Sequence, residues 1–171
     1  EIFADYHLAD AVIRFYARHA ELAPTGSERT RAAMTARAVA AVLPADIDAI
    51  AAVLAPGIEY VDHRPLGLGS ACGADIYLRG LRSLFDGMDG ALATDNELIV
   101  ATSDALLLRR KTTGILRAGG GAFEHRMLML WVFRDDGCIT HIEMFEPDRD
   151  VAALARFDAL TQPTPEPRFA N

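Results

Sequence analysis

The spacing of hydrophobic residues changes near residue 97, and this change constrains the fold more than any other feature of the chain. Before it, segments 3–22 and 75–85 carry apolar side chains at helical spacing, and segments 27–43 and 46–55 are predicted as helices from their N-terminal residues and, in 27–43, from a high alanine content. After it, the segments ELIVAT, DALLLRRKTTGIL, AFEHRMLMLWVFR and CITHIEMFE alternate as strands do. Turn-forming residues separate them, including the glycine run 119–121 and Asp135-Asp136-Gly137. Helices followed by an antiparallel meander predict an α+β domain, a curved sheet with helices on one face.

Size and charge narrow the possible classes of protein. With 171 residues and 51% hydrophobic content, the chain can form one domain with a proper core. We expect an N-terminal helical extension over 1–30, the main domain over 31–160, and a poorly ordered proline-rich tail over 161–171. The net charge of -7 opposes binding to nucleic acid. The longest apolar runs are too short to cross a membrane.

The cysteine content predicts a reduced, cytoplasmic protein. Cys72 and Cys138 are too few for a disulfide scaffold, and their separation does not suit a metal site. The sequence also has no cluster of histidines and carboxylates with metal-ligand spacing, so we expect neither a metal nor another cofactor.

Segment 52–69, AVLAPGIEYVDHRPLGLG, predicts the rim of a pocket. A short strand over 58–63 follows a Pro-Gly break and delivers Asp62, His63 and Arg64 to one spot. Strand alternation places Tyr60 and Asp62 on one face and His63 on the other. Asp62 could cap the following loop, or it could face an apolar cavity in which desolvation would make it a usable base. His63 would reach a ligand only if the chain bends before Pro65.

The strand over 122–134 carries a second set of candidates. One face holds His125 among large apolar side chains, Phe123, Met127, Met129, Trp131 and Phe133. Methionine and tryptophan at this spacing are usually core, and His125 could be either a satisfied core histidine or a partner of Asp62 or a ligand. Residues 109–111 are three adjacent cations, so at least one faces each way. Solvated ion pairs would explain them, as would Arg110 entering the cavity mouth to meet a carboxylate ligand.

The order of these elements resembles the nuclear transport factor 2-like (NTF2-like) superfamily, in particular its SnoaL-like and ketosteroid-isomerase-like domains. The motifs that carry the resemblance are LAPGIEYVDH at 54–63, FRDDGCITHIEMFEPD at 133–148 and the helix between them. The resemblance implies a conical antiparallel sheet with helices on its concave face, enclosing one cavity. Asp62 would fall where ketosteroid isomerases keep their proton-moving aspartate. Tyr60 and Asp62 would fall where limonene-epoxide hydrolases hold the attacking water.

The chain departs from both enzyme patterns at their second catalytic groups. Met129 and Met144 stand where those families have acidic residues, and Ala38 stands near the position of the isomerases' helix tyrosine. The resemblance therefore implies a fold more firmly than a chemistry.

From these features we predict a cofactor-free acid-base enzyme of isomerase, cyclase or hydrolase type that acts on a hydrophobic small molecule. Asp62 would move the proton, and Tyr60 or His125 would stabilise the developing oxyanion. The predicted substrate-binding residues are Met127, Met129, Trp131, Met144, His63 and Arg110. The alternative is a non-catalytic ligand-binding or dimerisation domain, part of a larger regulatory protein.

The outer face of the sheet predicts self-association. This face would carry Leu128, Leu130 and Val132, with His141 and Glu143 as exterior or dimer-facing residues. Because soluble monomers avoid such apolar patches, we expect a homodimer that covers it.

Overall fold

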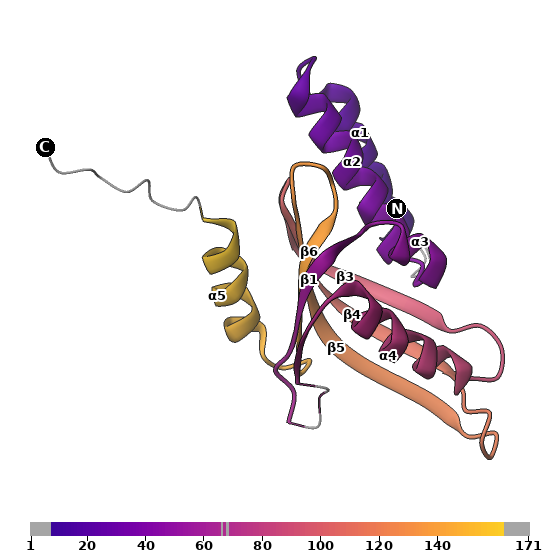
Figure 1. Ribbon diagram of the computed structural model, residues 1–171. Coiled ribbons are helices and arrows are strands. Elements are labelled where there is room, and N and C mark those ends of the chain that lie inside the picture. The colour runs from indigo at the N-terminus through magenta and orange to yellow at the C-terminus, as the bar shows by residue number, and fades with distance from the viewer. Residues whose placement is uncertain (1–7, 66, 68, 163–171) are drawn as a thin grey trace, which may run out of the picture.

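A computed structural model describes residues 8–65, 67 and 69–162, and it contains a six-stranded sheet with helices on both faces (Figure 1). The elements are α1 (Leu8–Leu22), α2 (Ser27–Val42), α3 (Ile47–Ala51), β1 (Leu54–Asp62), β2 (Ser70–Cys72), α4 (Ala74–Asp86), β3 (Ala93–Ala101), β4 (Ala105–Ile115), β5 (Ala122–Phe133), β6 (Ile139–Phe145) and α5 (Asp150–Thr161). The predicted α+β class is confirmed. The predicted helix start at Phe3 and the proline-rich tail beyond residue 162 lie outside the described residues.

The strand order is β2-β1-β6-β5-β4-β3, so the two edge strands, β2 and β3, do not pair with each other. Figure 1 shows that the sheet is curved. Strands β3 to β6 form the expected antiparallel meander. Strand β1, however, pairs parallel with β6, which makes the sheet mixed where we had predicted it to be antiparallel. The long connection through α4 and the meander makes this parallel pairing possible.

Strand β1 is longer than the sequence indicated. It begins at Leu54 and continues through Pro56-Gly57, whereas the helix predicted over 46–55 shortens to α3. Its pairing with β6 is irregular between Leu54 and Glu59, and this irregularity accommodates a proline that cannot donate a backbone hydrogen bond. The three-residue β2 was not predicted, because it is too short for alternation to show.

Two apolar cores lie on opposite faces of the sheet. The larger core joins α1, α2 and α4 to the face that carries Trp131 and Met129. The smaller core joins α5, through Ala153 and Phe157, to the other face. Figure 1 shows α5 on one side of the sheet and α1 to α4 on the other. The packing of α5 departs from the prediction that all the helices share the concave face.

Helix α5 covers the leucines from which we predicted a dimer. Leu128 and Leu130 are fully buried within the single chain, packed against the smaller core. The predicted exposed leucine row is therefore wrong, and the apolar-patch argument for a homodimer fails with it. The sequence offered no sign that α5 would pack on this face.

Glu143 was predicted to face the exterior, but it is fully buried between β6 and α5. Arg156 of α5 donates to its carboxylate from Nε at 3.1 Å, and His63 Nε2 and His141 Nε2 each lie 2.7 Å from it. Burial, the largest effect, raises the pKa of Glu143, but hydrogen bonds from His141, Arg156 and His63 outweigh it and leave the pKa far below its usual value. A buried carboxylate with three partners is a structural anchor for α5.

Candidate functional site

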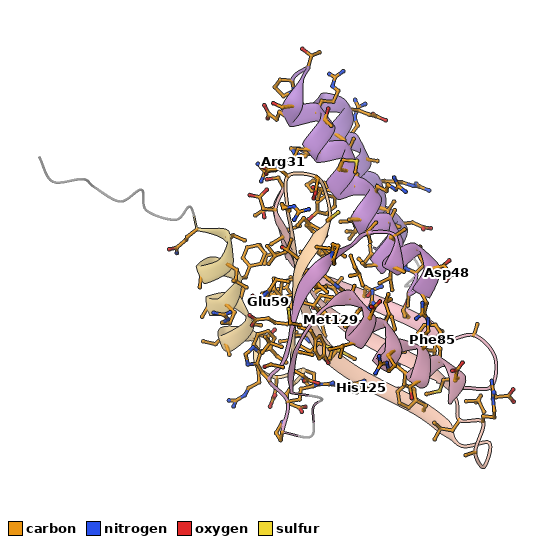
Figure 2. The ribbon with its side chains drawn as sticks, in the orientation of Figure 1. Arg31, Asp48, Glu59, Phe85, His125 and Met129 are labelled. Atoms are coloured by element: carbon orange, nitrogen blue, oxygen red, sulfur yellow. The ribbon has the colours of Figure 1, made fainter. Side chains whose placement is uncertain are left out.

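A pocket of about 830 Å³ lies between the sheet and α4. Its volume falls within the range of small-molecule sites, roughly 300–1,000 Å³. Figure 2 shows His125 and Met129 on β5 and Phe85 on α4, and all three line the pocket. The apolar wall on the sheet side is formed by the residues that sequence alternation grouped together, Met127, Met129, Trp131 and Met144.

Asp62, Arg64 and His125 form a hydrogen-bonded chain at the polar end of this pocket. Arg64 holds the Asp62 carboxylate at both oxygens, with Nε 2.8 Å from Oδ1 and Nη2 2.7 Å from Oδ2. Its remaining terminal nitrogen, Nη1, lies 2.5 Å from His125 Nε2. The Asp62 side chain is fully buried, and Arg64 and His125 line the pocket whereas Asp62 does not. Asp62 therefore lies behind Arg64 as seen from a ligand.

The contact with Arg64 determines the state of His125. A guanidinium can only donate hydrogen bonds, so Nε2 of His125 must accept, and a neutral ring then carries its proton on Nδ1. Burial, followed by the positive charge of Arg64, lowers the pKa of His125 below its usual value of 6.5. His125 is thus a neutral imidazole that can offer an Nδ1–H to a ligand oxygen.

Tyr60 belongs to the same network. Its hydroxyl donates to Asp62 Oδ2 at 3.3 Å, and its ring lies 5.4 Å from that of Tyr77. Burial raises the pKa of Tyr60, and the Asp62 carboxylate raises it further. Tyr60 therefore remains a neutral phenol that helps to hold Asp62.

Arg110 enters the pocket from β4 and is buried. Its Nε donates to Asn96 Oδ1 and its Nη2 to the carbonyl oxygen of Val42, both at 2.8 Å. Its guanidinium carbon lies 5.2 Å from the ring centre of Trp131, a cation–π distance.

His63 lies away from the pocket, on the face of the sheet that α5 covers. Its ring stacks on Phe145 with the centroids 4.5 Å apart, and Nε2 pairs with Glu143. This position follows the strand alternation and does not support the predicted contact with substrate. His63 is not among the residues that line the pocket.

Arg64 and Tyr77 are among the pocket residues that sequence reasoning did not assign to the site. Arg64 was noted only as a charge at the rim, although a short Asp-x-Arg spacing before a proline lets the arginine fold back onto the carboxylate. Tyr77 was omitted from the apolar stripe of α4, although Tyr77, Leu81 and Leu84 recur at i, i+4 and i+7 and all line the pocket.

Among residues 8–65, 67 and 69–162, no group of three or more His, Cys, Asp or Glu side chains is arranged to hold a metal ion. Within the same residues, no helix has the length and apolar character needed to span a membrane.

Comparison with known proteins identifies the fold. No protein-family model matches the sequence, and no curated protein is similar enough to count as a relative. Among solved structures, an NTF2-like protein from Burkholderia thailandensis E264 is 27% identical, with a TM-score of 0.53 over 78% of this chain and 98% of that one. A protein classed as a SnoaL-like polyketide cyclase, from Jannaschia sp. CCS1, is 17% identical, with a TM-score of 0.54 over 82% and 98% of the two chains.

A third structure, TerC co-crystallised with polyporic acid, is 17% identical, with a TM-score of 0.51 over 74% of this chain and 96% of that one. These similarities bear out the resemblance found in the sequence.

Proposed function

We propose that this chain, which belongs with the NTF2-like and SnoaL-like proteins, binds a hydrophobic small molecule and acts on it by cofactor-free acid-base chemistry of isomerase, cyclase or hydrolase type. The observation that carries the proposal is a largely apolar pocket with one polar network, Asp62–Arg64–His125, at its end. TerC, which shares the fold, was crystallised with a small molecule, and this is consistent with ligand binding by such a pocket.

The network suggests how a proton could move. The carboxylate of Asp62 takes a proton from a carbon next to a substrate carbonyl, and the electron pair of that C–H bond shifts onto the carbonyl oxygen. The Nδ1–H of His125 donates to this oxygen as its negative charge develops. Return of the proton to another carbon completes an isomerisation. In a cyclisation the carbanion attacks a second carbonyl of the substrate, and the resulting alkoxide takes the proton that Asp62 holds.

Arg64 must change partners in this scheme. It holds both carboxylate oxygens of Asp62, so one of these contacts has to open when a substrate enters. The released N–H groups can then meet the oxyanion, where a charge-assisted hydrogen bond is strong.

A non-catalytic ligand-binding domain is the second candidate function, and a specific observation favours it. No Asp or Glu is among the described residues that line the pocket, and Arg64 shields Asp62 from it. If Arg64 never releases Asp62, the pocket can bind a ligand without transferring a proton.

Hydrogen exchange at carbon tests the two candidates. We would incubate 1-tetralone, a hydrophobic ketone, with the protein in D₂O and follow loss of its α-proton signals by NMR, while Trp131 fluorescence reports binding. The enzyme proposal expects exchange faster than in buffer, and a loss of roughly a hundredfold in Asp62→Asn with binding retained. Asp95→Asn, an exposed residue of β3, is the control.

The outcomes separate the candidates. Binding without accelerated exchange would favour the ligand-binding domain. Exchange that persists in Asp62→Asn would show that Asp62 is not the base. If neither 1-tetralone nor the two probes 4-phenylbutanoate and 4-phenylbutanamide bind, both candidates are contradicted.

A homodimer and a cytoplasmic location remain proposals. Because α5 covers Leu128 and Leu130, a dimer would have to use another surface. A monomer mass by light scattering at micromolar concentration would contradict the dimer. The cytoplasmic location rests on Cys72 and Cys138, both free thiols, and would be checked by cell fractionation.

A further inference from the structure

We infer that the ligand of this pocket carries a carboxylate and that Arg110, together with Tyr77, binds it. The inference rests on the proposed small-molecule function and adds the chemical class of the ligand and its orientation.

The charge of the pocket lining is the first observation. The whole chain has a net charge of -7, yet the described residues that line the pocket include Arg64, Arg79 and Arg110 and no Asp or Glu. Arg64 is neutralised by Asp62 behind it, and Arg79 is exposed to solvent. Of these three arginines, Arg110 is therefore the one whose charge is neither paired with Asp62 nor exposed to solvent.

Arg110 is only 6% exposed and, within the described part of the chain, forms no ion pair with an acidic side chain. Its partners are neutral oxygens, the Asn96 side chain and the carbonyls of Val42 and Leu43 at the end of α2. A buried charge without a counter-charge is unusual, because desolvation is costly unless an ion pair offsets it. Burial lowers the pKa of Arg110 to about 10, which still leaves it charged at neutral pH.

A purely structural role explains only part of this geometry. Nε and Nη2 hold Asn96 and the last carbonyls of α2, as an arginine at a helix C-terminus often does. The other terminal nitrogen, Nη1, has no hydrogen-bond acceptor among the described residues. Because Arg110 lines the pocket and Trp131 supports its guanidinium, Nη1 is available to a ligand.

Tyr77 supplies a second donor. It lines the same pocket from α4, and its hydroxyl has no partner among the described residues. Burial raises the pKa of Tyr77 to about 12, and the guanidinium of Arg110 is close enough to oppose this rise. Tyr77 therefore keeps its O–H, and a carboxylate could accept from Tyr77 with one oxygen and from Arg110 with the other.

The sheet register orients such a ligand. Arg110 pairs with Met127, and Thr112, two residues further along β4, pairs with His125. Two residues of a strand span about 7 Å. A carboxylate on Arg110 would therefore direct the rest of the ligand along the methionine wall and place a second oxygen within reach of His125.

A matched pair of probes tests the carboxylate subsite. We would titrate the protein with 4-phenylbutanoate and with the neutral isostere 4-phenylbutanamide, and follow the fluorescence of Trp131, the only tryptophan. The wild type should bind the carboxylate roughly tenfold or more tightly than the amide. In Arg110→Gln this preference should disappear while the amide binds as before.

Two further variants keep the test informative if Arg110→Gln fails to fold. Tyr77→Phe removes only the hydroxyl and should reduce the preference by about fivefold, the usual effect of one lost hydrogen bond. Arg110→Lys keeps the charge and should retain part of the preference. Arg109→Gln is the control, because Arg109 lies next in the chain but faces the other way and pairs with Glu97 and Asp150.

Equal affinity of the two probes in the wild type would overturn the carboxylate subsite and leave the pocket proposal intact. If the Arg110→Gln variant still binds the carboxylate more tightly than the amide, another residue binds the carboxylate and the inference is overturned. If neither probe binds the folded wild type, the inference fails, and the proposed binding function fails with it only when 1-tetralone does not bind either.

Discussion

Asp62 and Gly67 show how one close approach shapes the candidate site. A Cβ on Gly67 would lie 2.5 Å from both carboxylate oxygens of Asp62, far inside van der Waals contact. Only glycine at position 67 fits this close to the carboxylate that Arg64 holds. The requirement is steric, since Gly67 does not have a positive φ.

We predict that Gly67→Ala displaces Asp62 from Arg64 and lowers the free energy of unfolding by about 1–3 kcal/mol, the usual cost of overpacking. Thermal or denaturant unfolding measures this loss. Gly57→Ala is the matched control, because a Cβ there meets nothing within 4 Å and the variant should remain near wild-type stability. Equal stability of the two variants would contradict the close approach.

At His125 we predict a dependence on Arg64 that NMR can read directly. Arg64→Gln removes a positive charge that lowers the pKa of His125, so this pKa should rise, while the burial that also lowers it remains. Titration of the His125 ring proton measures the change. An unchanged His125 pKa would argue against the contact.

The same depressed pKa sets the sign of a pH effect on stability. Because the unfolded chain binds the proton on His125 more readily than the folded chain, the contribution of His125 is complete above its usual pKa of 6.5. It is lost as the pH falls from that value toward the folded pKa.

Among the elements, α5 determines that the second face of the sheet is buried within the chain. Its Ala153 and Phe157 pack over Leu128 and Leu130. Its Arg156 pairs with the buried Glu143. A face that would otherwise be an apolar patch becomes a second core within one chain.

We predict that Phe157→Ala lowers the free energy of unfolding by about 3 kcal/mol, since it removes a buried aromatic ring from this core. Val151→Ala, on the same helix but 84% exposed, should change it little. Chemical denaturation of both variants measures the difference. A Phe157→Ala protein as stable as Val151→Ala would show that α5 contributes little to the fold.

Across the whole molecule, hydrogen bonds and apolar packing join the α1–α2 pair to the sheet. Tyr16 and Thr35 of the α1–α2 pair donate to the backbone of the β3–β4 turn, at 2.9 Å to Thr102 and 3.1 Å to Ser103. The same helices share the larger core with Trp131. The helical pair is therefore anchored to the sheet at both the turn and the core.

From this arrangement we predict two-state unfolding in which the helical signal and Trp131 fluorescence change together. Circular dichroism and fluorescence, recorded over one urea titration, measure the two transitions. Loss of helical signal at lower urea than the fluorescence change would mean that α1 and α2 melt separately.

Where the periodic pattern was long, the sequence by itself determined which segments form helices or strands and on which face each side chain lies. The alternation along 122–134 correctly separated Met127, Met129 and Trp131 from Leu128 and Leu130, because side chains on a strand must point in alternate directions. The turn-forming residues also predicted the hairpins, because a turn depends on the conformations that its own few residues favour.

Only the tertiary structure decided what each face meets. Three features depend on contacts that the local sequence does not show, either between residues far apart in the chain or across an irregular loop. They are whether α5 covers the leucines, whether Arg64 folds back onto Asp62, and whether Arg110 finds an acidic partner. Periodicity reports which way a side chain points but not its neighbour, and a charged group's chemistry depends on that neighbour. The pocket's wall could therefore be predicted from sequence, whereas the electrostatics at its polar end could not.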